Sequence, residues 1–243
     1  MSSHSLKGCV YLIPTPLYET ALQSLPAEVM EALGRIRYFY AEKATTARRF
    51  IKKLLPDVDL KTRIWLEIDK HRPVSLEPLR QWLLAGAEVG ILSEAGCPGI
   101  ADPGQLLVAE AHRLGARVIP LTGPNALILA LMASGMNGQQ FRFCGYLPVE
   151  SKQRRQMIQA LERRVQETGE TQIFIETPYR NQQLLTALLQ QLHPQTWLCV
   201  AAELTSPHAF IQSAPISQWR TSALPNLHKK PSVFLIGLPA HAA

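Results

Sequence analysis

Closely spaced cysteines are absent from this sequence of 243 residues. Its four cysteines include no C-x-x-C pair, and its seven histidines show no ligand spacing. A zinc site or a disulfide framework needs such spacing, so we expect no metal, and we expect reduced thiols in a cytoplasmic protein. No run approaches the roughly 18 consecutive apolar residues of a membrane-spanning helix. The first residues also lack the pattern of a signal peptide, so we expect no membrane partner.

The common motifs of nucleotide-binding and hydrolytic enzymes are missing too. The sequence contains no G-x-x-x-x-G-K-[ST], G-x-G-x-x-G, G-x-S-x-G or H-E-x-x-H, which argues against conventional kinases, dehydrogenases and hydrolases. Acidic residues number 19 against 25 basic ones, which gives a net charge of +6. This charge is compatible with RNA as a partner, but it is weak evidence because the basic residues are scattered in clusters such as Arg154-Arg155 and Lys229-Lys230.

Strand-like apolar runs alternate with helix-like segments along the whole chain. The runs lie at residues 9–14, 36–41, 63–68, 88–92, 117–120, 141–145, 171–175, 196–201 and 233–236. This alternation predicts an α/β fold with mainly parallel sheets, and we expect Ser75 and Ser151 to cap the helices that follow them. We place the domain boundary in the L-T-G-P segment, with an N-terminal α/β domain over residues 1–121 and a C-terminal α/β domain over residues 122–243.

The segment S-E-A-G-C-P-G-I-A-D-P-G, residues 93–104, is the most informative part of the chain. It holds three glycines and two prolines directly after the apolar run V-G-I-L. Glycine permits a positive φ and a close approach of the backbone to a ligand, and ligands of α/β sheets bind outside the carboxyl ends of the strands. The segment therefore predicts a ligand cradle, with a merely tight connection as the alternative.

Shorter glycine- and proline-containing loops follow four other strand-like runs. They are P-T-P at 14–16, T-G-P-N at 122–125, G-Y-L-P at 145–148 and E-T-P-Y at 176–179. If the strands are parallel, these loops gather at one edge of each sheet, which suits a ligand held by backbone groups.

In this order, the loops resemble the tetrapyrrole methylase superfamily of S-adenosylmethionine-dependent methyltransferases. More narrowly, they resemble the branch that methylates a cytidine ribose 2′-hydroxyl in small-subunit ribosomal RNA. Residues 93–104 are similar to the family's S-D-A-G-x-P-x-I-x-D-P-G loop. The family's A-T-P, A-E-D-T-R and P-x-P-G-P-x-A segments resemble residues 14–16, 41–45 and 120–126. Its F-x-G-F-L-P, F-Y-E-S-P-H-R and A-R-E-L-T-K segments resemble residues 143–148, 174–180 and 201–206.

The sequence departs from the family's pattern mainly at charged positions. Tyr18-Glu19 stands where the family has Gly-Asn, and Lys43 and Thr45 stand where it has Asp and Arg. Ala202 and Ser206 stand in place of an Arg and a Lys, and Lys230-Pro231 stands in place of a late Gly-Glu. Basic side chains position a phosphate backbone. The departures therefore bear on the RNA substrate and leave the cofactor loops largely intact.

The resemblance implies two α/β domains that flank a cleft for S-adenosylmethionine, usually in a homodimer. The residues it assigns to cofactor binding are Pro14, Ala95, Gly96, Cys97, Pro98, Ile100, Pro124, Asn125, Ala126 and Tyr146. We interpret Cys97 as a small turn residue beside the cofactor, in preference to a nucleophile.

A sulfonium methyl donor is already activated, so the enzyme mainly aligns donor and acceptor, although a hydroxyl acceptor gains from a nearby base. The catalytic candidates are Glu176, our first choice, with Glu42 and Asp102. Each has a structural alternative: Asp102 as a helix N-cap, and Glu42 as a surface carboxylate. The candidates for substrate binding are Arg155, Arg180 and Glu203, with Arg180 alternatively a partner of Glu176.

Three functions remain open from the sequence. The first is a methyltransferase that acts on ribosomal RNA. The second is a methyltransferase that acts on a tetrapyrrole or another small molecule. The third is a degenerate, non-catalytic protein that binds the cofactor or RNA.

Overall fold

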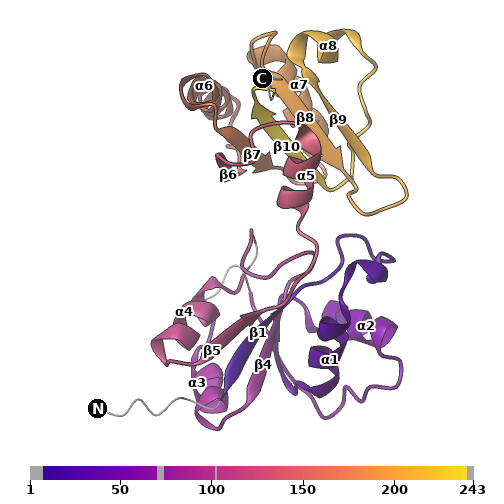
Figure 1. Ribbon diagram of the computed structural model, residues 1–243, viewed down its shortest axis with the longest axis vertical. Helices are drawn as coiled ribbons and strands as arrows, with labels where there is room; N and C mark the ends of the chain where they lie inside the picture. Colours follow the sequence, from indigo (N-terminus) through magenta and orange to yellow (C-terminus); the bar gives the residue numbers. More distant parts are fainter. Residues whose placement is uncertain (1–7, 70–73, 102, 240–243) are drawn as a thin grey trace. The chain divides into compact units, whose positions relative to one another are not determined.

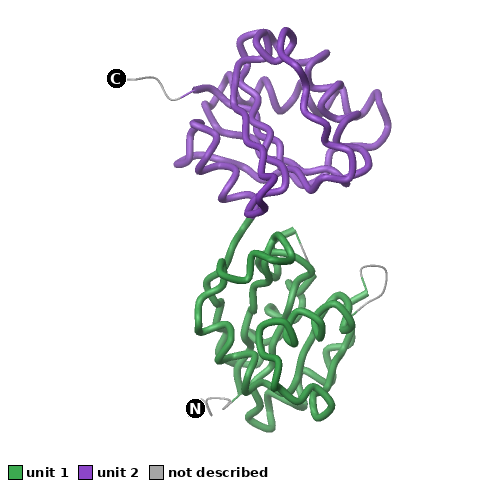
Figure 2. The backbone as a smooth tube through the Cα atoms, turned by 90° about the vertical axis from the view of Figure 1, so that its right-hand side faces the viewer, with its two compact units in different colours: residues 1–125 green, residues 126–243 purple. Residues whose placement is uncertain are grey.

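The computed structural model describes residues 8–69, 74–101 and 103–239. The chain forms two compact units, residues 1–125 and 126–243 (Figure 2). The division lies in the connection between strand β5 (Arg117–Pro120) and helix α5 (Ala126–Ser134). Among the helices in the described ranges, none combines the length and the hydropathy needed to span a bilayer.

The first unit is built on a parallel sheet of five strands in the order β3-β2-β4-β1-β5. Its strands are β1 (Cys9–Ile13), β2 (Tyr38–Ala41), β3 (Ile64–Glu67), β4 (Glu88–Leu92) and β5. The central strands are nearly continuous apolar runs because both of their faces are covered. The predicted parallel α/β arrangement is confirmed for this unit.

Helices cover both faces of the first sheet (Figure 1). Helices α1 (Ala27–Arg35) and α2 (Ala44–Leu54) pack on one face against buried side chains such as Ile13 and Phe39. Helices α3 (Glu77–Leu84) and α4 (Gln105–Arg113) pack on the other face against Val10 and Tyr40. Neighbouring residues of one strand thus enter opposite cores, as the alternation of side chains along a strand requires. A short 3-10 helix, η1 (Leu22–Ser24), precedes α1.

The second unit is also α/β, but its sheet is mixed, with the order β6-β7-β10-β8-β9. Its strands are β6 (Phe141–Tyr146), β7 (Thr171–Ile175), β8 (Trp197–Ala202), β9 (Phe210–Pro215) and β10 (Ser232–Gly237). Among these strands β6 and β7 are parallel, whereas β7–β10, β10–β8 and β8–β9 are antiparallel. The expectation of mainly parallel sheets is therefore corrected for this unit. The connection from β8 to β9 is too short for the helical crossover that parallel neighbours need.

Helices also cover both faces of the second sheet (Figure 1). Helix α5 packs on one face against side chains such as Cys199. Helices α6 (Ser151–Thr168), α7 (Asn181–Gln191) and α8 (Ile216–Thr221) cover the other face. Trp219 of α8 is fully buried there, and its indole nitrogen donates a hydrogen bond of 2.8 Å to the Leu198 carbonyl.

Both predicted serine caps are wrong. Helix α6 is capped by Glu150, whose carboxylate accepts hydrogen bonds of 2.8 Å from the amides of Lys152 and Gln153. Helix α3 begins after Leu76 without a side-chain cap, and the Ser75 carbonyl accepts a hydrogen bond from Tyr40. In α6, the carboxylate of Glu150, one residue before Ser151, supplies the acceptor that the first amides of the helix need.

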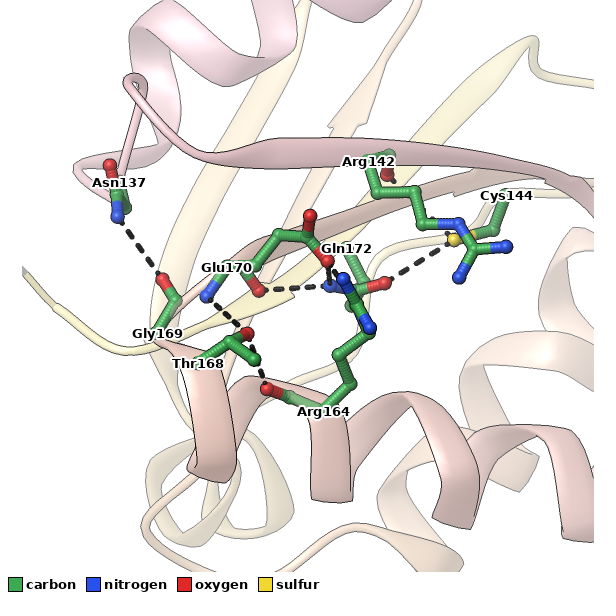
Figure 3. Close-up of polar contacts among 8 residues, drawn as sticks. All are labelled: Asn137, Arg142, Cys144, Arg164, Thr168, Gly169, Glu170 and Gln172. Carbon is green, nitrogen blue, oxygen red and sulfur yellow. Dashed lines mark hydrogen bonds and ion pairs between the residues drawn. The ribbon is translucent and has the colours of Figure 1, made fainter.

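The end of α6 is fastened to the start of β7 by polar contacts (Figure 3). Gly169 takes a positive φ of 68°, and its carbonyl accepts a hydrogen bond of 3.2 Å from Asn137. The Glu170 carboxylate lies 2.5 Å from Arg164 Nε and 2.9 Å from Gln172 Nε2. These contacts join the helix to the edge of the sheet and fix where β7 begins.

Candidate functional site

The loops after β1 and β4 meet at the carboxyl edge of the first sheet. Thr15 and Gly96 exchange two backbone hydrogen bonds, of 2.9 Å and 3.0 Å. The Ser93 hydroxyl also donates to the Gly96 carbonyl at 2.8 Å, and the Thr15 hydroxyl donates to the Ser93 carbonyl at 3.3 Å. The glycine-rich loop is therefore held rigidly against the first turn.

Two glycines allow the loop after β5 to join this group. Gly96 has a φ of +81°, and a Cβ added there would lie 3.2 Å from Leu17 Cδ2 and 3.3 Å from the Pro124 carbonyl oxygen. A Cβ added to Gly123 would lie only 2.2 Å from Pro14 Cβ. A side chain at Gly96 would be strained and crowded, and one at Gly123 would overlap Pro14, so glycine at these positions lets the three loops approach one another closely.

Cys97 lies between two of these loops. Its side chain is half-buried, and Sγ lies 3.5 Å from the Pro124 carbonyl oxygen, to which it donates. Burial raises the pKa of this thiol, and the nearby Asn125 side chain lowers it by a smaller amount. A thiol that stays protonated at neutral pH is a poor nucleophile.

Most of the sequence candidates in the first unit lie in the three loops that converge here, which follow β1, β4 and β5. Its loops carry Pro14, Ala95, Gly96, Cys97, Pro98, Pro124 and Asn125. Ile100, in the same loop as Gly96, is 49% exposed, which leaves an apolar side chain facing solvent. Asp102 lies outside the described residues, and α4 begins after Gly104 without a side-chain cap. Glu42 is half-buried directly after β2, at the same edge of the sheet.

A cavity of about 300 Å³ adjoins the first turn and the glycine-rich loop. Thr15 and Ala95 line it from these loops, while Thr46, Arg49 and Phe50 line it from α2. These α2 residues were not among the sequence candidates, because helical periodicity alone does not tell which residue borders a cavity. The α2 residues follow the family-like segment at residues 41–45 directly in the sequence, and this position is the sequence signal that could have identified them.

At the edge of the second sheet where β7 ends, Glu176 is buried and firmly held. Its Oε1 accepts a hydrogen bond of 2.6 Å from the Thr177 amide and lies 2.6 Å from Arg180 Nη2. Arg180 is thus the ion-pair partner of Glu176, one of the two roles considered for it. The pair fixes the orientation of the carboxylate.

Glu203 follows β8 at the same edge of the second sheet. It has a positive φ of 51°, and its Oε2 lies 2.8 Å from Lys230 Nζ. The Glu203 amide also donates a hydrogen bond of 2.9 Å to the Pro231 carbonyl. Lys230 was not among the sequence candidates, because it is distant in the chain and only the antiparallel pairing of β8 with β10 brings it here.

The remaining candidates of the second unit are more dispersed. Tyr146 ends β6 and is 57% exposed, and Ala126 begins α5. On α6, Arg155 is exposed, whereas Arg154 is buried and its Nη1 donates a hydrogen bond of 3.0 Å to the Val149 carbonyl. Arg154 therefore has a structural role, and Arg155 is the arginine of this pair that a ligand can reach. In the described ranges, no group of three His, Cys, Asp or Glu side chains gathers as a metal site requires.

Comparison with characterised proteins identifies the family. The chain is 32% identical over 209 residues to the protein of Vibrio cholerae named ribosomal RNA small subunit methyltransferase I, covering 86% of this chain and 69% of that protein. The proteins of the same name from Bacillus subtilis and Escherichia coli O157:H7 are each 31% identical, with 68% and 72% of their lengths covered. The chain belongs to the ribosomal RNA small subunit methyltransferase I family. No family model matches it.

Membership in this family confirms the predicted resemblance and makes the chain a methyltransferase. The non-catalytic and small-molecule alternatives are disfavoured. Methyl transfer requires a methyl donor.

Proposed function

We propose that this enzyme transfers a methyl group from S-adenosylmethionine to a ribose 2′-hydroxyl of small-subunit ribosomal RNA. The observation that carries the donor assignment is the Thr15–Gly96 bridge, which holds a glycine with a φ of +81° against the Pro124 turn. The names of the relatives and the net charge of +6 support an RNA acceptor.

The residues proposed to contact the donor are those of the three converging loops of the first unit, together with two residues of the second unit, Ala126 and Tyr146, that the family resemblance implies. They are Pro14, Ala95, Gly96, Cys97, Pro98, Ile100, Pro124, Asn125, Ala126 and Tyr146. When bound, the donor supplies an activated methyl group on a sulfonium centre. The protein's task is then to exclude water and to hold the acceptor oxygen in line with that methyl group.

The residues proposed to act on the acceptor lie mainly in the second unit. Glu176 orients the ribose hydroxyl and accepts its proton as the oxygen takes the methyl group and the donor's carbon–sulfur bond breaks, which leaves a neutral thioether, with Glu42 and Asp102 as the other candidates for this role. Arg155, Arg180 and Glu203 are proposed to contact the RNA. The hydrogen bond from the Thr177 amide and the ion pair with Arg180 support this role of Glu176, because they prevent the carboxylate from rotating.

We further infer that the enzyme works in the cytoplasm, where it meets ribosomal RNA, and that it forms a homodimer. The family resemblance supports both inferences. Sedimentation equilibrium of the purified protein tests the dimer, which a monomer at micromolar concentration would contradict.

The first experiment is a calorimetric titration with S-adenosylmethionine and S-adenosylhomocysteine. We expect saturable binding in the wild type, and loss of binding in Gly96→Ala, whose new Cβ would lie 3.3 Å from the Pro124 carbonyl. Gly115→Ala is the matched control, since Gly115 has a similar φ of +71° but nothing within 4 Å of an added Cβ. Equal loss in both variants would attribute the effect to backbone strain.

The second experiment follows the methyl group. Small-subunit ribosomal RNA transcribed in vitro is incubated with the enzyme and a labelled donor, with a tetrapyrrole in parallel. We expect the label in a nucleotide that resists alkaline cleavage, because methylation removes the 2′-hydroxyl that attacks the neighbouring phosphate. Label in the tetrapyrrole would support the alternative acceptor, and label on a base would overturn the ribose assignment.

A further inference from the structure

The segment before β10 forms a turn that is fastened to the start of α7. The Lys229 amide donates a hydrogen bond of 3.0 Å to the Pro178 carbonyl, and the Lys230 carbonyl accepts one of 2.6 Å from the fully buried Asn181. The Leu227 amide also bonds to the Gln182 side chain at 3.0 Å. Three hydrogen bonds thus hold this turn in place although its outer side chains are in solvent.

The turn and the adjoining loop present an aromatic ring among basic side chains. Tyr179 is 70% exposed, and its ring meets that of His228 edge-on with centroids 6.2 Å apart. His228 and Lys229 are exposed, and Lys229 forms no ion pair with any residue that the structure describes. We call Tyr179, His228, Lys229 and Lys230 the Tyr179 surface.

The two lysines of the Tyr179 surface differ in their surroundings. Lys230 Nζ lies 2.8 Å from Glu203 Oε2, so its charge is already paired. Lys229 is exposed and has no carboxylate partner among the described residues, so its charge is the one that a phosphate can meet.

We propose that the Tyr179 surface binds single-stranded RNA. Lys229 contacts a phosphate, and Tyr179 stacks on a base. A basic surface with an exposed aromatic ring suits single-stranded RNA, whose unstacked bases are free to lie on such a ring. This inference rests on the proposed function and assigns part of the RNA to residues that were not among the candidates for substrate binding.

The test uses the full chain and a fluorescein-labelled, single-stranded oligonucleotide with a small-subunit ribosomal RNA sequence. Fluorescence anisotropy at several KCl concentrations gives the affinity and its salt dependence. We expect Lys229→Ala to weaken binding several-fold and to reduce the slope of log K against log salt by about 0.7, the value of one phosphate contact to a single strand. Tyr179→Ala should weaken binding about tenfold with an unchanged slope, and Tyr179→Phe should bind like the wild type.

Lys61→Ala is the matched control, because Lys61 is an exposed lysine before the amino end of β3, at the opposite edge of the first sheet from its ligand loops. If Lys229→Ala and Lys61→Ala weaken binding equally, the Tyr179 surface is not an RNA site, whereas the proposed function stands if the wild type methylates RNA. If the wild type binds the donor but no RNA, both the inference and the RNA substrate are wrong. A urea denaturation curve like that of the wild type shows that each variant is folded.

Discussion

Glu176 Oε1 lies 2.6 Å from Arg180 Nη2 and, at the same distance, accepts a hydrogen bond from the Thr177 amide. The carboxylate is almost completely buried, with a side chain only 1% exposed, whereas the arginine side chain is 33% exposed. A buried charge that is paired and hydrogen-bonded is tolerated, while an isolated one is costly. The pair therefore makes a fixed carboxylate possible directly after a central strand of the sheet.

Removing Arg180 should destabilise the second unit. In Arg180→Ala, the buried Glu176 carboxylate keeps the amide but loses its cation, so we expect the free energy of unfolding to fall by about 1–3 kcal/mol. Urea denaturation of wild type and variant measures this change. Arg180→Lys retains the charge but not the planar guanidinium, and it should recover part of the loss. Equal stability of all three proteins would show that the pair is not coupled to folding.

The same pair separates stability from catalysis. Glu176→Gln keeps an oxygen for the Thr177 amide but removes the proton acceptor, so we expect kcat for methyl transfer to fall at least a hundredfold while donor affinity stays unchanged. Single-turnover kinetics and calorimetry measure the two quantities. An unchanged kcat would exclude Glu176 as the base and leave Glu42 and Asp102 as candidates.

Cys97→Ala should retain methyl transfer. Burial raises the pKa of the Cys97 thiol, so little thiolate is present at neutral pH, and the side chain serves as a small group beside the Pro124 carbonyl. We expect kcat to change less than threefold, and we expect alkylation of Cys97 by iodoacetamide to be slow at pH 7 and faster as the pH rises. Loss of activity with unchanged donor affinity would instead indicate a covalent role.

The first unit could be predicted from the sequence in more detail than the second. Its strands are buried on both faces, and this burial produces the apolar runs that identified them. Strand β9 is an edge strand with mostly half-buried residues, so Phe210–Pro215 shows no comparable run. Without β9, the antiparallel pairing in the second sheet could not be anticipated, and neither could the contact between Glu203 and Lys230.

In the candidate site, too, the sequence identifies some residues and not others. Glycine and proline mark Gly96 and Gly123 in the sequence because their backbone conformation or close contacts exclude other residues. Charged residues carry no such mark. Arg154 and Arg155 are adjacent and identical in type, and only the packing of α6 shows that one is buried and the other exposed.

Glu110 should make the first unit sensitive to acid. Hydrogen bonds from Arg113 and Arg80 lower the pKa of the buried Glu110 carboxyl to about 2. A lowered pKa stabilises the fold above the ordinary pKa of glutamate, about 4.5, and this contribution is lost as the pH falls towards about 2. Glu110→Gln should be less stable at pH 7 and should lose less stability between pH 5 and pH 3. Glu77→Gln, at an exposed ion pair, is the control that should change little.

Arg154 and Arg155 provide a paired test of which residues of α6 meet RNA. Arg155→Ala removes an exposed charge, so we expect weaker RNA binding, a salt slope reduced by about 0.7 and unchanged stability. Arg154→Ala removes a buried side chain that donates to the Val149 carbonyl, so we expect lower stability and an unchanged salt slope. Anisotropy titrations in KCl and urea denaturation of both variants give the four values. If Arg155→Ala leaves the slope unchanged, α6 does not border the RNA, and Lys229, in the turn before β10, becomes the main candidate for the phosphate contact.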